Sequence, residues 1–515
     1  MVTKALSPQQ AAVLDLVKTG RGSIEVVARA GCGKTFLLLK IVEAVAAMGN
    51  SDLILMAYNK SIGDELKSKI SALGIDWKVA QAGTCHSFGY AALRKLYPNT
   101  KIETDKVRNI INYMHEQERE KSFGDPIPFW NDCSALVERA VSLAKQRAFG
   151  HLCKIDDRAA WIEMWEYFDL DSELRELYHR NDVINEAIGV LQYSFSIDRN
   201  VIDFDDMILA PLIHKAPFWK KKWVLVDESQ DTNAARRALA LALLAPGGRM
   251  VFVGDDRQAI YGFTGADGNS MSQLKIATNA VSMPLNVTYR CPKVVVQEAQ
   301  RLVPDITAHP SAPDGSFRSI EMKDFQSEVL TADDVILCRN TAPLVSTAFS
   351  LLSRGIPCKV EGRDIGKGLI RLARRWKTKT LAQLSDKLAG YRETEVKKLT
   401  DTGKESRIQN IVDQVECLEV IIARCSSLKK HNVDDLVKMI EDMFGNSSEE
   451  VKKVLTLSTI HKSKGREWKR VFTLGRAKYL PSPYARLDWQ IVQEANLEYV
   501  QLTRAQSELI DIVIG

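Results

Sequence analysis

The stretch Ala28-Arg-Ala-Gly-Cys-Gly-Lys-Thr35 lies between an apolar, β-branched run that starts at Ile24 and a helix-like run that starts at Phe36. The order strand, glycine loop, helix is typical of a phosphate-binding loop, because backbone N–H groups and the positive end of a helix dipole meet there. Gly31 and Gly33 allow the backbone to approach the ligand closely. Alanine stands at position 28, where the usual pattern has its first glycine, and we expect this position to need only a small side chain.

The residue types after the loop suit a nucleoside triphosphate. Lys34 would reach the β- and γ-phosphates, and the Thr35 hydroxyl would ligate Mg²⁺. The other residues predicted to contact the nucleotide here are Ala28, Gly31, Cys32, Gly33 and Phe36. If the loop stood alone, a chance glycine turn would remain a strong alternative.

A second signal is the acidic pair that follows the apolar run Trp223–Val226. Phosphoryl transfer needs a carboxylate that binds Mg²⁺ and one that activates water, and Asp227 and Glu228 are predicted to fill these roles. Acidic pairs after strands are common in loops, so this signal is moderate by itself. The two signals together, in the expected order, strongly favour a nucleotide site.

Apolar runs alternate with helix-like segments along most of the chain, which predicts α/β units with parallel sheets covered by helices. A second such region begins near Leu285. Two stretches that are helical and rich in charge, 95–200 and 366–449, interrupt the pattern and read as insertions. We find no internal repeat at a fixed period.

The bulk composition sets wide limits. A chain of 515 residues is long enough for several domains, and 45% hydrophobic with 26% charged residues is typical of a soluble globular protein. The net charge of +5 only mildly favours a polyanionic partner. The nine cysteines show no metal-ligand spacing, and no apolar run is long enough for a membrane span. We therefore expect a protein of the cytoplasm or nucleus that is neither secreted nor membrane-bound.

Seven segments in order resemble the motifs of superfamily 1 DNA helicases of the UvrD/Rep type, and the resemblance extends over nearly the whole chain. The segments are Leu6–Gln10, Ala28–Thr35, Asp227–Asp231, Val253–Asp267, Asn286–Arg290, Thr459–Trp468 and Tyr499–Ala505. A chance match of seven ordered motifs is negligible. The segment that starts at Ala57 is closer to phage-like and F-box-helicase variants, and Phe36 stands where the UvrD branch commonly has arginine.

The resemblance implies two RecA-like, parallel-sheet P-loop domains around one ATP, each interrupted by a mainly helical insertion. Arg290 and Arg504 would act from the second domain on the charge that develops during phosphoryl transfer. The implied boundaries are 1–94 and 201–282 for the first domain, 95–200 for its insertion, 283–365 and 450–515 for the second domain, and 366–449 for its insertion.

The resemblance also implies roles for nucleotide contacts outside the loop. Gln10 would read the adenine, Tyr289 would stack on it, and Glu467 would lie near the sugar. Gln258 would sense the γ-phosphate. The implied cofactors are ATP and Mg²⁺.

Single-stranded DNA is held by positive grooves and by aromatic faces on which bases stack. The candidates that the family pattern indicates are Tyr58, Asn59, His86, Phe88, Phe263, Thr459 and His461. The alternative is that Phe88 and Phe263 are core aromatics and that His461 is a hydrogen-bonded polar residue.

Two further elements are ambiguous. The acidic element Asp203–Asp206 resembles one that follows the first insertion in this family, and its carboxylates are expected to be structural caps. The basic segment 370–379 could bind duplex phosphates or could be a solvated helix face.

These features predict an ATP-dependent DNA helicase or translocase that moves along single strands from 3′ to 5′ and unwinds duplex DNA in replication, recombination or repair. Its expected partners are single-stranded DNA, single-strand/duplex junctions, and a loading, replication or repair protein. The alternatives are a translocase that strips proteins from DNA and an ATP-timed scaffold without processive unwinding.

Overall fold

The computed structural model describes residues 5–49, 52–121, 128–174, 177–196, 200–262, 269–401, 408–444 and 454–514. The chain forms two compact units. The first unit comprises Met1–Ala28 and Gly33–Leu285, and the second comprises Arg29–Cys32 and Asn286–Gly515.

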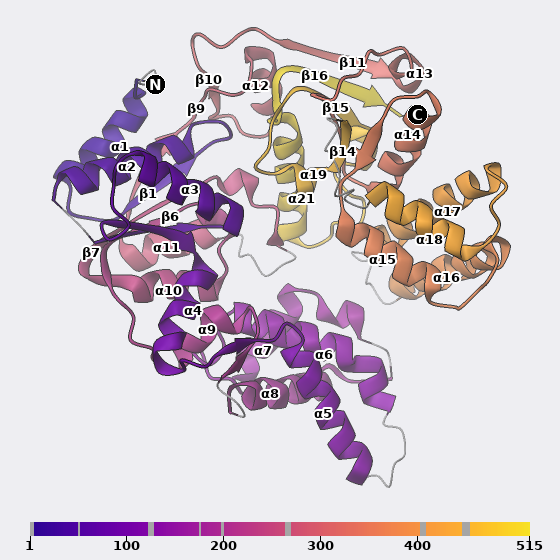
Figure 1. Ribbon diagram of the computed structural model, residues 1–515, viewed down its shortest axis with the longest axis horizontal. Helices are drawn as coiled ribbons and strands as arrows, with labels where there is room; N and C mark the ends of the chain where they lie inside the picture. The colour runs from indigo at the N-terminus through magenta and orange to yellow at the C-terminus, as the bar shows by residue number, and fades with distance from the viewer. Residues whose placement is uncertain are drawn as a thin grey trace. The chain divides into compact units, whose positions relative to one another are not determined.

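The first unit is built on a six-stranded sheet in which all paired strands are parallel (Figure 1). Its order is β3-β2-β6-β7-β1-β8. The strands are β1 (Ile24–Ala28), β2 (Leu53–Ala57), β3 (Ala80–Thr84), β6 (Lys221–Val226), β7 (Leu244–Gly254) and β8 (Val281–Leu285). The central strands are apolar and buried, as expected of a parallel sheet with helices on both faces.

Helices of the first unit begin where the sequence supplies capping side chains. Ser7 and Gln10 form a capping box, and Asn59, Thr84 and Asn233 each accept a backbone N–H of the following turn. The helices around this sheet are α1 (Pro8–Thr19), α2 (Lys34–Ala47), α3 (Lys60–Ala72), α4 (Cys85–Leu96), α9 (Asp206–Ile213), α10 (Ala234–Leu243) and α11 (Ser270–Thr278).

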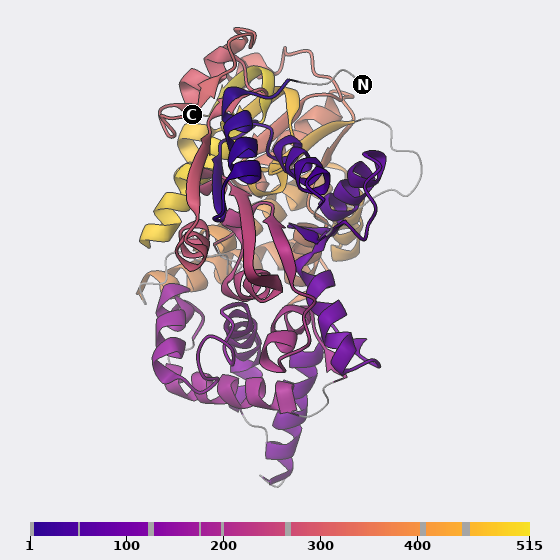
Figure 2. The same ribbon diagram turned by 90° about the vertical axis from the view of Figure 1, so that its left-hand side faces the viewer.

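A group of helices is inserted between the short paired strands β4 (Lys101–Ile102) and β5 (Val201–Ile202) (Figure 2). The helices are α5 (Lys106–Lys121), α6 (Pro128–Gln146), α7 (Arg158–Tyr167) and α8 (Arg180–Ser196). Trp130, Trp161 and Trp165 are buried in their core, which is continuous with the core beneath the sheet. The insertion and the sheet therefore share one hydrophobic core.

The second unit has its own six-stranded sheet, in the order β11-β16-β15-β12-β14-β13, and all its paired strands are parallel. The strands are β11 (Ser316–Glu321), β12 (Val335–Cys338), β13 (Cys358–Val360), β14 (Leu455–Thr459), β15 (Trp468–Leu474) and β16 (Ala505–Val513). A separate pair is formed by β9 (Val287–Thr288) and β10 (Thr307–Ala308). The α/β class with two parallel sheets, predicted from the sequence, is confirmed.

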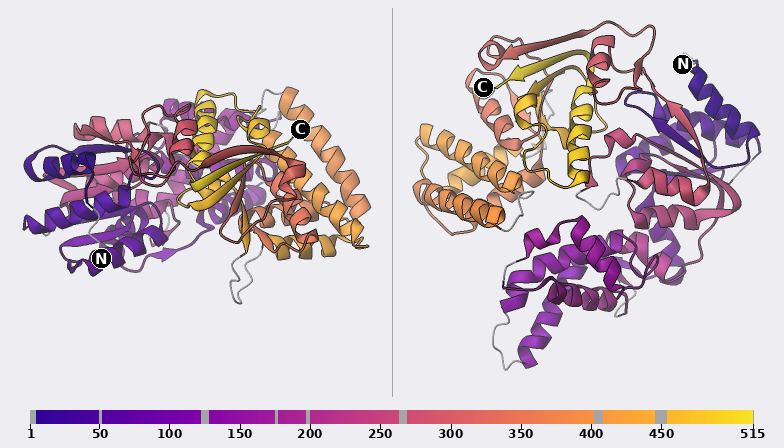
Figure 3. Two further views of the ribbon diagram at one scale, coloured as in Figure 1. Left: turned by 90° about the horizontal axis from the view of Figure 1, so that it is seen from above. Right: turned by 180° about the vertical axis from the view of Figure 1, so that it is seen from behind.

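Helices cover this sheet and form a second inserted group (Figure 3). The covering helices are α12 (Lys293–Ala299), α13 (Met322–Phe325), α14 (Thr341–Ser353), α19 (Ile460–Ser463), α20 (Arg476–Tyr479) and α21 (Asp488–Leu502). The inserted group lies between β13 and β14. It consists of α15 (Arg363–Arg374), α16 (Leu381–Asp401), α17 (Ile408–Ser427) and α18 (Val433–Phe444).

The inserted group contains two turns of similar backbone geometry, one between α15 and α16 and one between α17 and α18. Thr380, before α16, and Asn432, before α18, form an antiparallel bridge. The Leu381 N–H donates to the His431 carbonyl at 2.9 Å, and the Val433 N–H donates to the Lys379 carbonyl at 3.1 Å. The two helix–turn–helix segments thus pair through the same pattern of hydrogen bonds in both directions.

The matching extends to the turns. Lys377 and Lys429 both adopt left-handed backbone conformations, with φ of 52° and 56°. Thr380 accepts the Gln383 N–H, and Asn432 accepts the Asp435 N–H in the same way. The two turns therefore share a left-handed residue and the same type of side-chain cap.

Within the described part of the chain, no helix combines the length and the apolar character that crossing a membrane requires.

Candidate functional site

The glycine loop begins where β1 ends. Ala28 is the last residue of this strand, is fully buried and has no need of a left-handed backbone, which explains why alanine is accepted there. Gly31 and Gly33 have φ of 74° and 80°, a region that strongly favours glycine. Gly33 directly precedes α2, so Lys34 and Thr35 are the first residues of that helix.

Lys34 lies against the carboxylate predicted to activate water. Its Nζ is 2.7 Å from Glu228 Oε1 and 2.8 Å from Oε2. Burial alone would lower the pKa of Lys34, but the carboxylates of Glu228 and Asp227 hold this pKa above its ordinary value. The loop lysine is therefore a firmly charged group among carboxylates of the same unit.

Asp227 follows β6 directly and is buried, with its Oδ1 accepting the Glu228 N–H at 2.9 Å. Burial and the neighbouring Glu228 raise its pKa to about 7, while Lys34 acts in the opposite direction. Glu228 has a backbone φ of 47°, which is uncommon for a residue other than glycine. Two crowded carboxylates of this kind are suited to a cation.

The oxygen donors near the loop fit Mg²⁺. Asp227 supplies a carboxylate and Thr35 a hydroxyl, both of the hard oxygen type that Mg²⁺ prefers. Within the described residues no group of three or more His, Cys, Asp or Glu side chains could hold a metal ion.

A chain of hydrogen bonds connects Glu228 to Gln258, the residue predicted to sense the γ-phosphate. Gln230 Nε2 donates to Glu228 Oε2 at 2.5 Å, and its Oε1 accepts the Asp255 N–H at 3.0 Å. Gln258 Nε2 then donates to Asp255 Oδ2 at 2.6 Å. Gln230 and Asp255 lie inside the matched motifs, but nothing in the residue pattern assigned them this connecting role.

Gln10 lies beside the loop. Its Oε1 accepts the Ser7 N–H at 3.0 Å in the capping box of α1. A Cβ added to Gly33 would come within 3.1 Å of Gln10 Nε2. The residue predicted to read the adenine is thus next to the phosphate loop, although part of its amide also stabilises a helix end.

In the second unit, the guanidinium of Arg290 contacts Glu467, and its Nη1 donates to the Thr503 carbonyl at 3.3 Å. This unit includes the loop residue Gly31, whose carbonyl accepts the Tyr289 N–H at 3.0 Å. The Tyr289 ring is about half exposed and packs 4.8 Å from the His309 ring. Residues predicted to contact base, sugar and phosphate are therefore neighbours here.

Arg504 is almost completely buried. Its guanidinium donates to the carbonyls of Val500 at 2.8 Å and Arg466 at 3.1 Å. Burial and the nearby Arg290 lower its pKa to about 9. It is a positive group held in place by backbone acceptors.

Three of the residues predicted to bind DNA lie at the carboxyl ends of β2 and β3. The Tyr58 ring stacks on Tyr261 with centroids 6.0 Å apart, and the guanidinium of Arg236 lies 5.3 Å from the Tyr58 centroid. His86 follows Thr84 in the first turn of α4, and Asn59 caps α3. Tyr261 and Arg236 were not predicted, although Tyr261 lies inside a matched motif.

Other predicted DNA contacts are in different environments. Phe88 is in the core of the first unit, which favours the structural alternative for this residue. Thr459 ends β14 and is buried, and burial together with the nearby Arg339 lowers the pKa of His461 to about 3. Phe263 lies outside the described residues.

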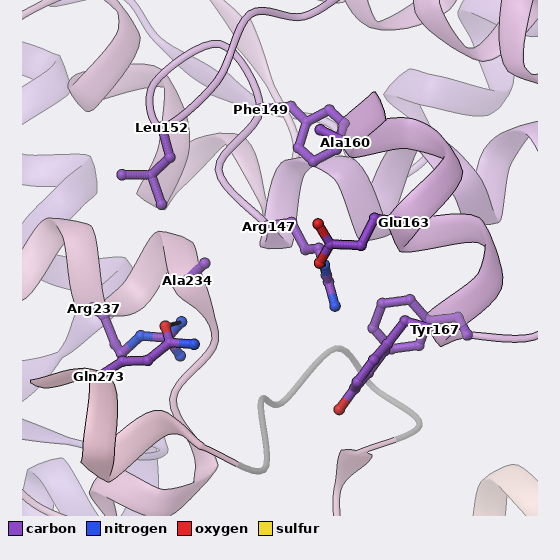
Figure 4. Close-up of a pocket in the computed structure, with 10 residues that line it drawn as sticks. Arg147, Phe149, Leu152, Ala160, Glu163, Tyr167, Ala234, Arg237 and Gln273 are labelled. Atoms are coloured by element: carbon purple, nitrogen blue, oxygen red, sulfur yellow. Dashed lines mark hydrogen bonds and ion pairs between the residues drawn. The ribbon is translucent and has the colours of Figure 1, made fainter. Parts of the chain in front are cut away.

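A cavity of about 200 Å³ lies elsewhere in the first unit, between the insertion and α10 and α11 (Figure 4). Arg147 and Glu163 approach it from one side, and Arg237 and Gln273 lie on the other. None of the residues predicted to bind nucleotide or DNA lines this cavity.

Two family descriptions match the chain: the UvrD/REP helicase N-terminal domain at residues 6–278 and the UvrD-like helicase C-terminal domain at residues 268–514. Similar curated proteins include the ATP-dependent DNA helicase srs2 of Schizosaccharomyces pombe, 24% identical over 56% of this chain and 33% of the relative. The ATP-dependent DNA helicase PcrA of Staphylococcus aureus is 25% identical over 56% of this chain and 39% of the relative. The ATP-dependent DNA helicase Rep of Buchnera aphidicola is 24% identical over 55% and 42%.

These matches cover less than half of each relative's length. The two family matches, in contrast, extend together over nearly all of this chain and include every motif segment identified in the sequence. The chain therefore belongs to the UvrD/Rep family of helicases.

Proposed function

We propose that this protein is a DNA-dependent ATPase that moves along single-stranded DNA from 3′ to 5′ and unwinds duplex DNA. The observation that carries the proposal is the arrangement around Lys34 in the first unit. A loop lysine lies 2.7 Å from Glu228, Asp227 is adjacent, and hydrogen bonds continue from Glu228 to Gln258. This arrangement suits hydrolysis of a triphosphate coupled to a change in structure.

In this mechanism the residues of the first unit bind and orient the triphosphate. When the triphosphate binds, Lys34 would move from Glu228 to the phosphate oxygens and neutralise their charge. The carboxylate of Glu228 would then orient the attacking water and accept its proton. Thr35 and Asp227 would hold Mg²⁺, which neutralises phosphate charge when bound. Hydrogen bonds run from Glu228 through Gln230 and Asp255 to Gln258. They would couple the water-activating carboxylate of Glu228 to the residue that contacts the γ-phosphate.

The second unit would contribute positive charge to the same ATP. Arg290 and Arg504 are held by carbonyl and carboxylate partners, so their guanidinium groups lose little entropy on meeting a phosphate. ATP binding would draw the units together, and hydrolysis would release them. Differential affinity for the single strand in the two states would convert each cycle into a step.

The single strand would cross the aromatic surface of the first unit. Tyr58, Tyr261 and Arg236 form a stacked group with a cation beside it, which suits successive bases and phosphates without reading sequence. Tyr58 directly follows β2, which pairs with β6, the strand that precedes Asp227, so the strand contact and the ATP chemistry would lie at one edge of the same sheet.

At a single-strand/duplex junction, the duplex DNA would contact the two turns of the second inserted group that precede α16 and α18. The turns that precede α16 and α18 carry exposed Lys377, Lys379 and Lys429. Two matched cationic turns suit a phosphate backbone. This favours the duplex-binding interpretation of the basic segment 370–379, and replacing the three lysines with glutamate should flatten the salt dependence of duplex binding.

The experiment that tests the proposal is unwinding of labelled duplexes that carry either a 3′ or a 5′ single-stranded tail, with and without ATP. We expect displacement only with ATP and only from the 3′-tailed duplex. Displacement from the 5′-tailed duplex would contradict the polarity, and no DNA stimulation of ATP turnover would contradict the proposed function.

The two alternatives make different predictions in the same assay. A translocase that strips proteins would leave both duplexes intact but would displace streptavidin from one end of a biotinylated single strand. An ATP-timed scaffold would hydrolyse ATP without displacing either. An ATP-driven, direction-dependent displacement of duplex DNA excludes both alternatives.

A further inference from the structure

The phosphate loop carries one long charged side chain that the proposed hydrolysis does not use. Arg29 lies in the first half of the loop, ahead of Lys34. The segment Arg29–Cys32 is part of the second unit, whereas Gly33 and Lys34 are part of the first. Arg29 is only 8% exposed, and a guanidinium that is buried to this degree needs a charged or polar partner.

Arg29 forms an ion pair with Asp305, which lies outside the matched motifs. Arg29 Nε is 2.9 Å from both carboxylate oxygens of Asp305, and its Nη2 is 2.8 Å from Oδ2. This two-pronged geometry fixes the direction of the contact as well as its length. The Asp305 side chain is half exposed, so the pair adds little to the free energy of unfolding. A geometry of this kind is better suited to positioning the loop than to stabilising the fold.

Asp305 is connected to the segment that carries Arg290. It shortly precedes β10, and β10 pairs with β9, the strand that directly precedes Tyr289 and Arg290. The His309 N–H donates to the Thr288 carbonyl at 3.0 Å at the end of this strand pair. A shift of Asp305 would therefore be passed through the strand pair to Arg290.

The loop residues that follow Arg29 are held to the same part of the second unit. The Ala30 N–H donates to the Tyr499 hydroxyl at 3.0 Å, and the Gly31 carbonyl accepts the Tyr289 N–H at 3.0 Å. Ala30 also belongs to the hydrophobic core of this unit. A Cβ added to Gly31 would come within 2.6 Å of Arg290 Cβ, so the loop backbone lies directly against Arg290.

We propose that Arg29 and Asp305 are positioning residues that hold the phosphate loop in register with Arg290. The inference rests on the proposed function, because it concerns hydrolysis of the same ATP. Neither side chain acts on the phosphates itself. Their ion pair fixes the start of the loop to the strand pair β9–β10, so that Gly31 and Arg290 keep a constant relation around the triphosphate. A misplacement of about 1 Å at such a point can slow the chemical step by about 10²-fold.

The first test compares steady-state ATP turnover, with saturating oligothymidylate, for the full chain and for Arg29→Gln, Asp305→Asn and Asp305→Glu. Loss of the pair should lower kcat by about 10- to 100-fold, because Arg290 no longer meets the transferred phosphate correctly. The KM for ATP should change by less than about 3-fold, because Lys34 and the loop N–H groups still bind the phosphates. Asp305→Glu keeps the charge and should recover part of the turnover.

The double variant Arg29→Gln/Asp305→Asn shows whether the two side chains act through each other. If they do, the double variant should be about as slow as either single variant. Losses that multiply would mean that the two residues act independently, which would overturn the inference.

A readout without turnover is the affinity for a fluorescent ADP, measured with and without aluminium fluoride, which mimics the transferred phosphate. Aluminium fluoride should tighten binding to the unmodified chain. Asp305→Asn should lose most of this gain but should bind the ADP alone normally. Unfolding midpoints should hardly differ, because the pair is half exposed. A large fall in the midpoint of both single variants would make the pair a structural contact and would overturn the inference.

The matched control is Asp314→Asn, which removes another carboxylate of the second unit from an ion pair. Asp314 is exposed and lies 2.8 Å from Lys293 Nζ. Its turnover, its KM and its response to aluminium fluoride should equal those of the unmodified chain, and a loss as large as that of Asp305→Asn would overturn the inference. Unaltered kcat in Arg29→Gln and Asp305→Asn would also overturn it, while leaving the proposed function intact. Absence of DNA-stimulated turnover in the unmodified chain would overturn both.

Discussion

Each of the two units has its own six-stranded parallel sheet. The site residues beside the sheet are acidic in the first unit and basic in the second. In the first unit, Asp227 follows β6 and Asp255 follows β7, and both are buried. In the second unit, Arg339 follows β12 and the buried Arg504 precedes β16. We therefore propose different chemical roles for the two units, although their sheets are alike, because fold alone does not define function.

Burial pushes site residues toward neutrality in both units, but in opposite directions. It raises the pKa of Asp227 to about 7 and lowers that of Arg504 to about 9. An acidic site is suited to a metal ion, and an arginine site is suited to a phosphate. This difference supports the proposal that the first unit holds Mg²⁺ and activates water and that the second unit stabilises anionic charge.

The largest expected effect comes from removing a cation of the second unit. Arg290→Ala should lower DNA-stimulated ATP turnover by about 10³- to 10⁵-fold, the range for an arginine that stabilises phosphoryl transfer. Arg290→Lys should recover only part of it, because an ammonium lacks the planar, two-pronged geometry. Steady-state ATPase assays with saturating oligothymidylate measure both.

The matched control for that prediction is Arg301→Ala, which removes an exposed arginine of the same unit that pairs with Glu298. It should leave turnover unchanged. If Arg290→Ala also turned over ATP normally, the second unit would have no part in hydrolysis and the comparison would fail.

A smaller loss is expected from the water-activating residue of the first unit. Glu228→Gln should lower hydrolysis by about 10²- to 10⁴-fold, the usual contribution of a general base. ATP binding should persist, because the amide still occupies the position beside Lys34. Filter binding of labelled ATP together with single-turnover hydrolysis separates these effects, and unimpaired hydrolysis would remove Glu228 from its role.

Lys34→Ala should have a more modest effect on turnover, about 10²- to 10³-fold, as for loss of one preorganised positive partner of the phosphates. Weaker ATP binding should accompany it. Lys40→Ala, on the same helix and paired with Glu43, is the control and should retain activity. Full DNA-stimulated turnover in Lys34→Ala would end the proposal that this protein is an ATP-driven motor.

The sequence was sufficient for the fold class, and it identified Lys34, Asp227 and Glu228, which we propose act on ATP and which the structure brings together. Alternating apolar runs predicted two parallel sheets, and both are present. Lys34, Asp227 and Glu228 come together because parallel strands end at one edge of the sheet. A rule of topology was enough for this part.

Contacts that depend on side-chain packing were beyond the sequence. Phe88 and Tyr58 were both predicted to bind DNA, yet one is in the core and the other carries a stack that the motifs did not reveal. The buried carboxylates of Asp203 and Asp206 pair with Lys106 and Lys145, which are distant in the chain. The paired turns of the second insertion were equally hidden, because backbone hydrogen bonds create them with little residue identity.

The smallest effect, and the sharpest test of the acidic half of the comparison, is the pH dependence of stability without Mg²⁺. The folded pKa of Asp227 is raised to about 7, above an unfolded value of about 3.9. The folded state therefore holds a proton that the unfolded state releases, so stability from this group is fully present below about pH 4. It is lost progressively as pH rises to about 7.

Asp227→Asn cannot lose this proton, so its unfolding midpoint should rise relative to that of the unmodified chain as pH increases from about 4 to 7. Mg²⁺ with a non-hydrolysable ATP analogue should cancel the difference, because the cation favours the ionised carboxylate of the unmodified chain alone. Parallel midpoints over this whole pH range would mean that Asp227 is already ionised without a cation. The first unit would then not be prepared for a metal ion by its own crowded carboxylates, and of the two residues compared only Arg504 would have a pKa shifted by burial.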